Sequence, residues 1–133
     1  MILTYCVAAA FIMHGFAHLS GFAATFTKRD LGFTNKPWLF SPGVTLQSSI
    51  GKVFGIFWLV AAMALDGSRI SLLARLRGLP GLPIGGALMS LLAIIPWWNT
   101  VVPGAKAGAL FDLITLIALL PPWREQVMAY LGL

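Results

Sequence analysis

The chain has 133 residues, of which 59% are hydrophobic and 10% are charged, and its mean hydropathy is +0.88. About a quarter of an average soluble domain is charged, so this composition excludes a water-soluble enzyme, a disordered tail and a disulfide scaffold. The net charge is +5, but the basic residues are spread among connecting segments, which is typical of lipid-headgroup contacts and not of nucleic-acid binding. The single cysteine, Cys6, is expected to act as a small hydrophobic residue. The lipid bilayer is therefore the predicted partner.

Four segments are long and apolar enough to be membrane spans. A spanning helix needs about 20 mostly apolar residues, because the bilayer core is about 30 Å thick and each residue rises about 1.5 Å. Residues 2–26, 46–65, 79–98 and 101–120 meet this requirement. We expect one all-α domain over residues 1–133, folded as an up-down bundle of four transmembrane helices. The tail, residues 123–133, has its apolar residues on one face and predicts a short interfacial helix.

The connection between the first two predicted spans is the longest. It contains Phe33, Trp38 and Phe40 and a turn signal at residues 42–43. We expect it to pack over the mouth of the bundle, with a small hairpin as one form.

The next connection carries Arg69, Arg75 and Arg77 and predicts either a short basic interfacial helix or a plain basic loop. Lysine and arginine are divided almost equally between the two sides of the bundle. We favour both termini inside, because these arginines lie in a short loop.

Several charged and aromatic residues are expected at the membrane interfaces. Lys52 and Asp66 bracket the second predicted span, and their side chains can extend to the headgroups. Trp97, Trp98 and Trp123 lie at predicted span ends, where aromatic belts form.

Small residues predict where the helices approach one another, since helix association in lipid depends on close backbone contact. We interpret these residues as packing positions without chemistry. They are Gly15, Gly21, Gly51, Gly55, Gly86, Ser90 and Gly108.

Three ionisable residues remain inside the predicted hydrocarbon region: His14, His18 and Asp112. A carboxylate at mid-membrane costs about 2.5–3.5 kcal/mol, so it is a functional-site hypothesis that requires a partner. The two histidines are four residues apart and share one helix face. The first and last helices of an up-down bundle are antiparallel neighbours, and Asp112 lies within about one turn of the level of His18. We therefore predict a hydrogen bond from Asp112 to His18 or His14.

This trio allows three interpretations. It can be an internal polar cluster that fixes how the helices align, a metal site with ligands of the kind that Zn, Fe, Ni or Cu accept, or a proton or small-molecule site. A bis-histidine haem in a monomer is disfavoured, because both histidines lie on one face of one helix.

The stretch from His14 to Phe22, with residues 55–59 and 108–112, resembles small bacterial four-span proteins similar in architecture to DoxX-like membrane proteins. The resemblance covers nearly the whole chain and implies a four-helix bundle that serves as an accessory subunit. DoxX-like proteins are associated with quinone-linked oxidoreductase partners. Their first span has a glycine and a lysine where this chain has histidines, so no catalytic residue is carried over.

The leading hypothesis is a non-enzymatic accessory or binding subunit with an intramembrane polar site, acting with a membrane protein partner or as a homo-oligomer. One alternative is a DoxX-like oxidoreductase component that binds quinone or a metal. The other is a component of a proton-coupled transporter.

Overall fold

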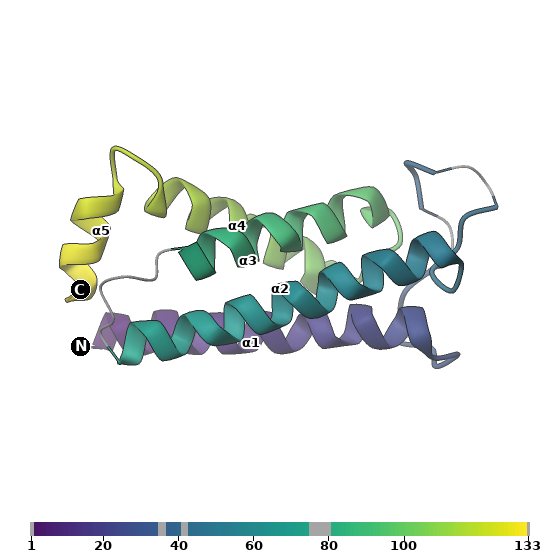
Figure 1. Cartoon of the computed structure of the whole chain (residues 1–133), viewed down its shortest axis with the longest axis horizontal. Coiled ribbons are helices and arrows are strands. Elements are labelled where there is room, and N and C mark those ends of the chain that lie inside the picture. Colours follow the sequence, from purple (N-terminus) through teal and green to yellow (C-terminus); the bar gives the residue numbers. More distant parts are fainter. Residues whose placement is uncertain (1, 35–36, 41–42, 75–80, 133) are drawn as a thin grey trace.

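The computed structural model describes residues 2–34, 37–40, 43–74 and 81–132, and within these ranges all regular structure is helical. Helices α1 to α4 lie along the long axis of the molecule and alternate in direction, so that both termini lie at the same end (Figure 1). Each helix packs against the next, and α1 also meets α4. The elements are α1 (Ile2–Phe26), α2 (Ser49–Leu73), α3 (Gly81–Ile94), the 3₁₀ turn η1 (Ile95–Trp97), α4 (Pro103–Leu119) and α5 (Arg124–Leu131).

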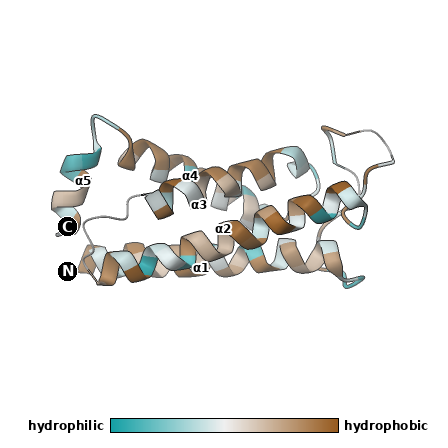
Figure 2. Cartoon of the chain, viewed as in Figure 1, coloured by the Kyte–Doolittle hydropathy of each residue, from teal (hydrophilic) through white to brown (hydrophobic). Residues whose placement is uncertain are grey.

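Two helices, α1 and α2, are long and apolar enough to cross a membrane, with 25 residues each. A third candidate exists only if α4 and α5, which meet at a bend of 102°, are counted together as one span. The 17 residues of α4 measure about 25 Å, somewhat less than the bilayer core. Apolar residues line α1 to α4 over most of their length, whereas α5 begins with hydrophilic ones (Figure 2). By length and composition, two helices, or up to three if the bent pair is one span, can cross a membrane.

Helix α1 has the bounds predicted for the first span, whereas α2 begins and ends later than the second predicted span. Helix α2 begins at Ser49, where the Ser48 side chain accepts a hydrogen bond from the backbone N–H of Gly51. It continues to Leu73 because charged residues such as Asp66 end an apolar run without breaking a helix. Arg69 therefore lies in α2 and not in a separate interfacial helix or loop, while Arg75 and Arg77 lie outside the described residues.

Prolines set the ends of the later helices. Pro96 lacks a backbone N–H, and the chain turns into η1 around it. Pro103 occupies the first position of α4, where no N–H is needed. The predicted interfacial tail forms α5, none of whose residues is buried.

The long loop between α1 and α2 packs over one end of the bundle, as predicted. Phe33 and Phe40 from the loop contact Trp58 and Trp97, with ring centroids 5.8 and 6.0 Å apart respectively. The described part of this loop contains no strand and hence no hairpin. Trp97 is fully buried, so its assignment to an aromatic belt is wrong.

Most of the predicted packing glycines lie at helix contacts. A Cβ atom on Gly21 would lie 2.6 Å from Cδ2 of Trp58, and one on Gly86 would lie 3.0 Å from the Leu65 side chain. Gly51 is an exception, because the atoms nearest to its built Cβ belong to Thr45 and Leu46 of its own preceding loop.

Candidate functional site

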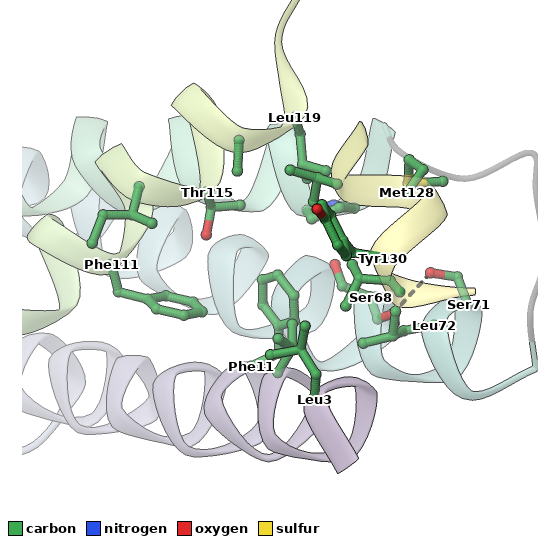
Figure 3. Close-up of a pocket in the computed structure, with 16 residues that line it drawn as sticks. Leu3, Phe11, Ser68, Ser71, Leu72, Phe111, Thr115, Leu119, Met128 and Tyr130 are labelled. Carbon is green, nitrogen blue, oxygen red and sulfur yellow. Dashed lines mark hydrogen bonds between the residues drawn. The ribbon is translucent and has the colours of Figure 1, made fainter. Parts of the chain in front are cut away.

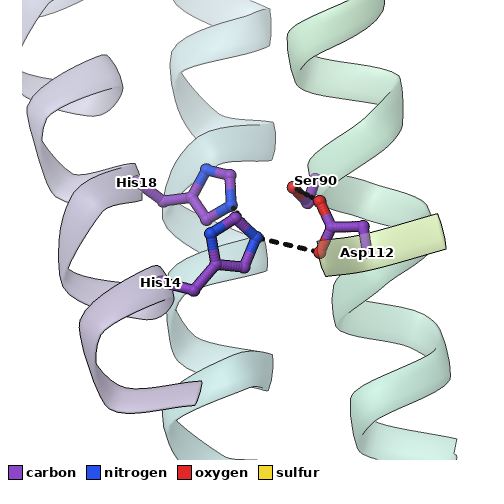
Figure 4. A network of polar contacts seen from close by, with 4 residues as sticks. All are labelled: His14, His18, Ser90 and Asp112. Atoms are coloured by element: carbon purple, nitrogen blue, oxygen red, sulfur yellow. Dashed lines mark hydrogen bonds and ion pairs between the residues drawn. The ribbon is translucent and has the colours of Figure 1, made fainter. Parts of the chain in front are cut away.

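The two histidines lie on the face of α1 that is turned into the bundle. Both are buried, His14 at 9% and His18 at 4% exposure, as their four-residue spacing on one helix face predicts. Their Nε2 atoms are 3.3 Å apart, and the ring centroids are 4.6 Å apart (Figure 4). Two imidazoles therefore point at one place inside the molecule.

Asp112 projects from α4 toward the same place and is completely buried. Its Oδ1 lies 2.9 Å from Nε2 of His14, so the predicted hydrogen bond between α4 and α1 is present, and the partner is His14. The hydroxyl of Ser90 on α3 donates to the other carboxylate oxygen, Oδ2 (Figure 4). Three helices thus each contribute to one polar cluster: His14, His18, Ser90 and Asp112.

Gly108 makes room for His14 between α1 and α4. It lies one turn before Asp112, and a Cβ atom there would overlap the His14 ring. Phe111 covers the ring from another side, with centroids 5.4 Å apart. The His14 ring therefore fits into the space that Gly108 leaves, packs against Phe111 and forms a hydrogen bond with Asp112.

Nε2 of His14 has more neighbours at hydrogen-bond distance than it can bond fully. A ring nitrogen has either one proton or one lone pair, yet Nε2 of His14 faces both Asp112 Oδ1 and His18 Nε2 at hydrogen-bond distance. One nitrogen cannot form a full hydrogen bond to both partners. A cation placed between the three atoms would satisfy all of them at once.

The distances within the cluster suit a metal ion at this place. One ligand atom from each of His14, His18 and Asp112 lies within 4.8 Å of the others. In a tetrahedral site with metal–ligand bonds of about 2.0–2.1 Å, neighbouring ligand atoms are about 3.3 Å apart. Two of the three separations, the 2.9 and 3.3 Å around His14, are close to that value, and the third, between His18 and Asp112, is within 4.8 Å. The fixed carboxylate is also typical of metal sites, since Ser90 holds the oxygen that does not face the histidines.

A second carboxylate, Asp66 on α2, lies against α1 at Gly15 and does not join the cluster. The interpretation of Asp66 as an interfacial residue at the end of a span is wrong: its side chain is half-buried against Gly15, whose built Cβ would lie 3.0 Å from Asp66 Cγ. Its Oδ1 atom has no hydrogen-bond partner, nor has Nε of Arg69 one turn later. Lys52, by contrast, is exposed.

Ser90 is the site residue that sequence reasoning assigned to packing alone. The available signal was its place as the one hydroxyl in α3, a helix that is otherwise apolar. The predicted trio of His14, His18 and Asp112 is brought together by the fold.

Comparison of the chain with protein-family models, with curated proteins and with solved structures found no match.

Proposed function

We propose that this protein is a four-span membrane protein that binds a divalent transition-metal ion at His14, His18 and Asp112. The observation that carries the proposal is that two other metal-ligating atoms, Asp112 Oδ1 and His18 Nε2, lie 2.9 and 3.3 Å from Nε2 of His14. Three protein ligands leave a fourth coordination position for water or a small ligand. The function is that of a binding or accessory subunit, in the sense implied by the resemblance to DoxX-like proteins.

The proposed setting is the bacterial cytoplasmic membrane. The composition, the two long apolar helices and the placement of both termini at one end of the bundle support it (Figure 1). The two shorter units, α3 with η1 and α4, complete the four spans in this proposal. Both termini lie inside, together with Arg69 and Arg124.

Metal analysis tests the proposed function. The protein is purified in mild detergent through a tag that contains no histidine, incubated with Zn²⁺ or Co²⁺, and freed of unbound metal before elemental analysis. We expect close to one ion per chain in the wild type. His14→Gln, His18→Gln and Asp112→Asn are each expected to lower metal affinity by about 10-fold or more, because each removes a ligand. Bound Co²⁺ also reports its coordination number and geometry by visible absorption.

Asp66→Asn is the matched control, because Asp66 is a half-buried carboxylate that also faces α1 but lies outside the cluster. It is expected to bind metal as the wild type does. A wild type that takes up no metal overturns the proposal, and so does equal uptake by the three ligand variants.

A proton site is the second candidate, and a specific observation favours it. Ser90, Asp112, His14 and His18 form a continuous row of close polar contacts across three helices. Such a row can carry protons in a transporter component. Proton flux into liposomes that is lost in Asp112→Asn, from protein that binds no metal, would replace the metal proposal with this one.

A further inference from the structure

A cavity of about 340 Å³ lies at the end of the bundle where both termini meet. Its walls come from α1, α2, α3 and α4, and α5 lies across it (Figures 1 and 3). Phe11 and Phe111 form its inner wall, with ring centroids 5.3 Å apart. Phe111 also contacts His14, so aromatic rings separate the cavity from the polar cluster.

The cavity is lined almost entirely by apolar side chains. Two of its few hydroxyls are already used within α2, since Ser71 donates to the carbonyl of Ser68 and Ser68 donates to that of Ala64. A water molecule needs two to four polar partners to stay in a cavity. An apolar cavity of about 150 Å³ stays dry and holds a benzene molecule, and this cavity has about twice that volume. A hydrocarbon chain therefore suits this cavity better than water does.

The position of α5 indicates where that hydrocarbon comes from. Val127, Met128 and Leu131 face the cavity, while Arg124, Glu125 and Gln126 are exposed. An amphipathic helix of this kind, bent 102° away from α4, lies at the level of the lipid headgroups. A molecule that fills the cavity from this side therefore has an apolar chain in the bundle and a polar end beside α5.

We propose that the cavity holds one acyl chain of a bilayer phospholipid, with its phosphate beside the guanidinium of Arg124. A phospholipid fits better than a free hydrocarbon because the helix that lies across the cavity begins with Arg124, an exposed cationic side chain, and arginine favours phosphate. The site depends on the protein lying in a membrane and not on metal binding at the polar cluster.

Photo-crosslinking in liposomes tests this site. The full chain is reconstituted with a phospholipid that carries a diazirine in one acyl chain, irradiated, and digested for mass spectrometry. We expect crosslinks at the cavity residues of α1 and α4, such as Phe11 and Thr115, above the level found at residues of α4 that face the bilayer. Ala118→Phe and Val7→Phe, which fill the cavity from two different helices, are each expected to lower this labelling at least 5-fold.

The matched control is Ile117→Phe, which adds a ring to the exposed side of α4 next to Ala118. It is expected to leave labelling of the cavity unchanged, and helix content by circular dichroism identifies any variant that fails to fold. Labelling that is equal at cavity and bilayer-facing residues overturns the proposal, as does labelling that both cavity-filling variants retain. Preferential labelling by a diazirine-bearing polyprenyl alcohol in competition with the phospholipid also overturns the assignment.

Discussion

At the end of the bundle covered by the long loop, aromatic side chains fill the space between the helices, whereas at the end where the termini meet that space is open. Trp58 and Trp97 are buried in the first region, and Phe40 and Phe54 pack against them. In the second region, α5 has no buried residue and covers a cavity of about 340 Å³. The polar cluster lies between the two. The comparison indicates that one end supplies stability and the other is available for binding.

The largest expected effect is the loss of aromatic packing at the filled end. Trp97→Ala removes a fully buried indole and is expected to lower the free energy of unfolding by about 3–5 kcal/mol. The adjacent Trp98→Ala, at a side chain that is 41% exposed, is expected to cost less than about 1 kcal/mol. Titration with a denaturing detergent measures both variants, and equal losses would mean that the filled end does not stabilise the fold as described.

An intermediate effect is expected between the two ends, where Gly108 faces His14. Gly108→Val places side-chain atoms where the imidazole lies and is expected to cost about 1–3 kcal/mol together with most of the metal occupancy. Gly104→Val is the control, because a Cβ atom at Gly104 on the same helix would meet nothing within 4 Å. Elemental analysis and detergent titration of both variants test this. Full metal occupancy in Gly108→Val would show that the position of the His14 ring does not matter.

The smallest effect on stability is expected at the open end. Truncation after Trp123 removes α5, and since none of its residues is buried the free energy of unfolding is expected to fall by less than about 1 kcal/mol. Metal occupancy is expected to stay unchanged, while acyl-chain labelling of the cavity falls. A loss of several kcal/mol would mean that both ends stabilise the bundle and would remove the contrast between them.

The sequence predicts the helices well where a polar segment ends an apolar one. Helix α1 ends at Phe26 because Lys28, Arg29 and Asp30 follow shortly after it. Helix α2 is underpredicted because hydropathy reports which residues suit lipid and not where backbone hydrogen bonding stops. Asp66 could therefore be placed correctly only with the partner helix in view, since Gly15 provides the space that its side chain occupies.

Sequence reasoning identifies the three ionisable residues of the site but not its neutral residue, Ser90. His14, His18 and Asp112 stand out because ionisable groups inside a membrane protein need partners. A serine in an apolar helix suits both close packing and hydrogen bonding, so only the structure separates these uses for Ser90. Trp97 shows the same ambiguity, because a tryptophan near a span end suits both a membrane interface and an aromatic core.

Gly15, which precedes Phe16 and follows His14 in α1, limits how far α1 can slide along its own axis. The histidines repeat after four residues, so a slip of α1 by one turn would bring His18 opposite Asp112 in place of His14. The same slip would move Leu19 to the place of Gly15, where even a single Cβ atom would lie 3.0 Å from Asp66 Cγ and 3.2 Å from the carbonyl oxygen of Ala62. Leucine has no room there. Gly15 thus blocks a sliding motion that the paired histidines would otherwise tolerate, and each histidine keeps its own position relative to the carboxylate.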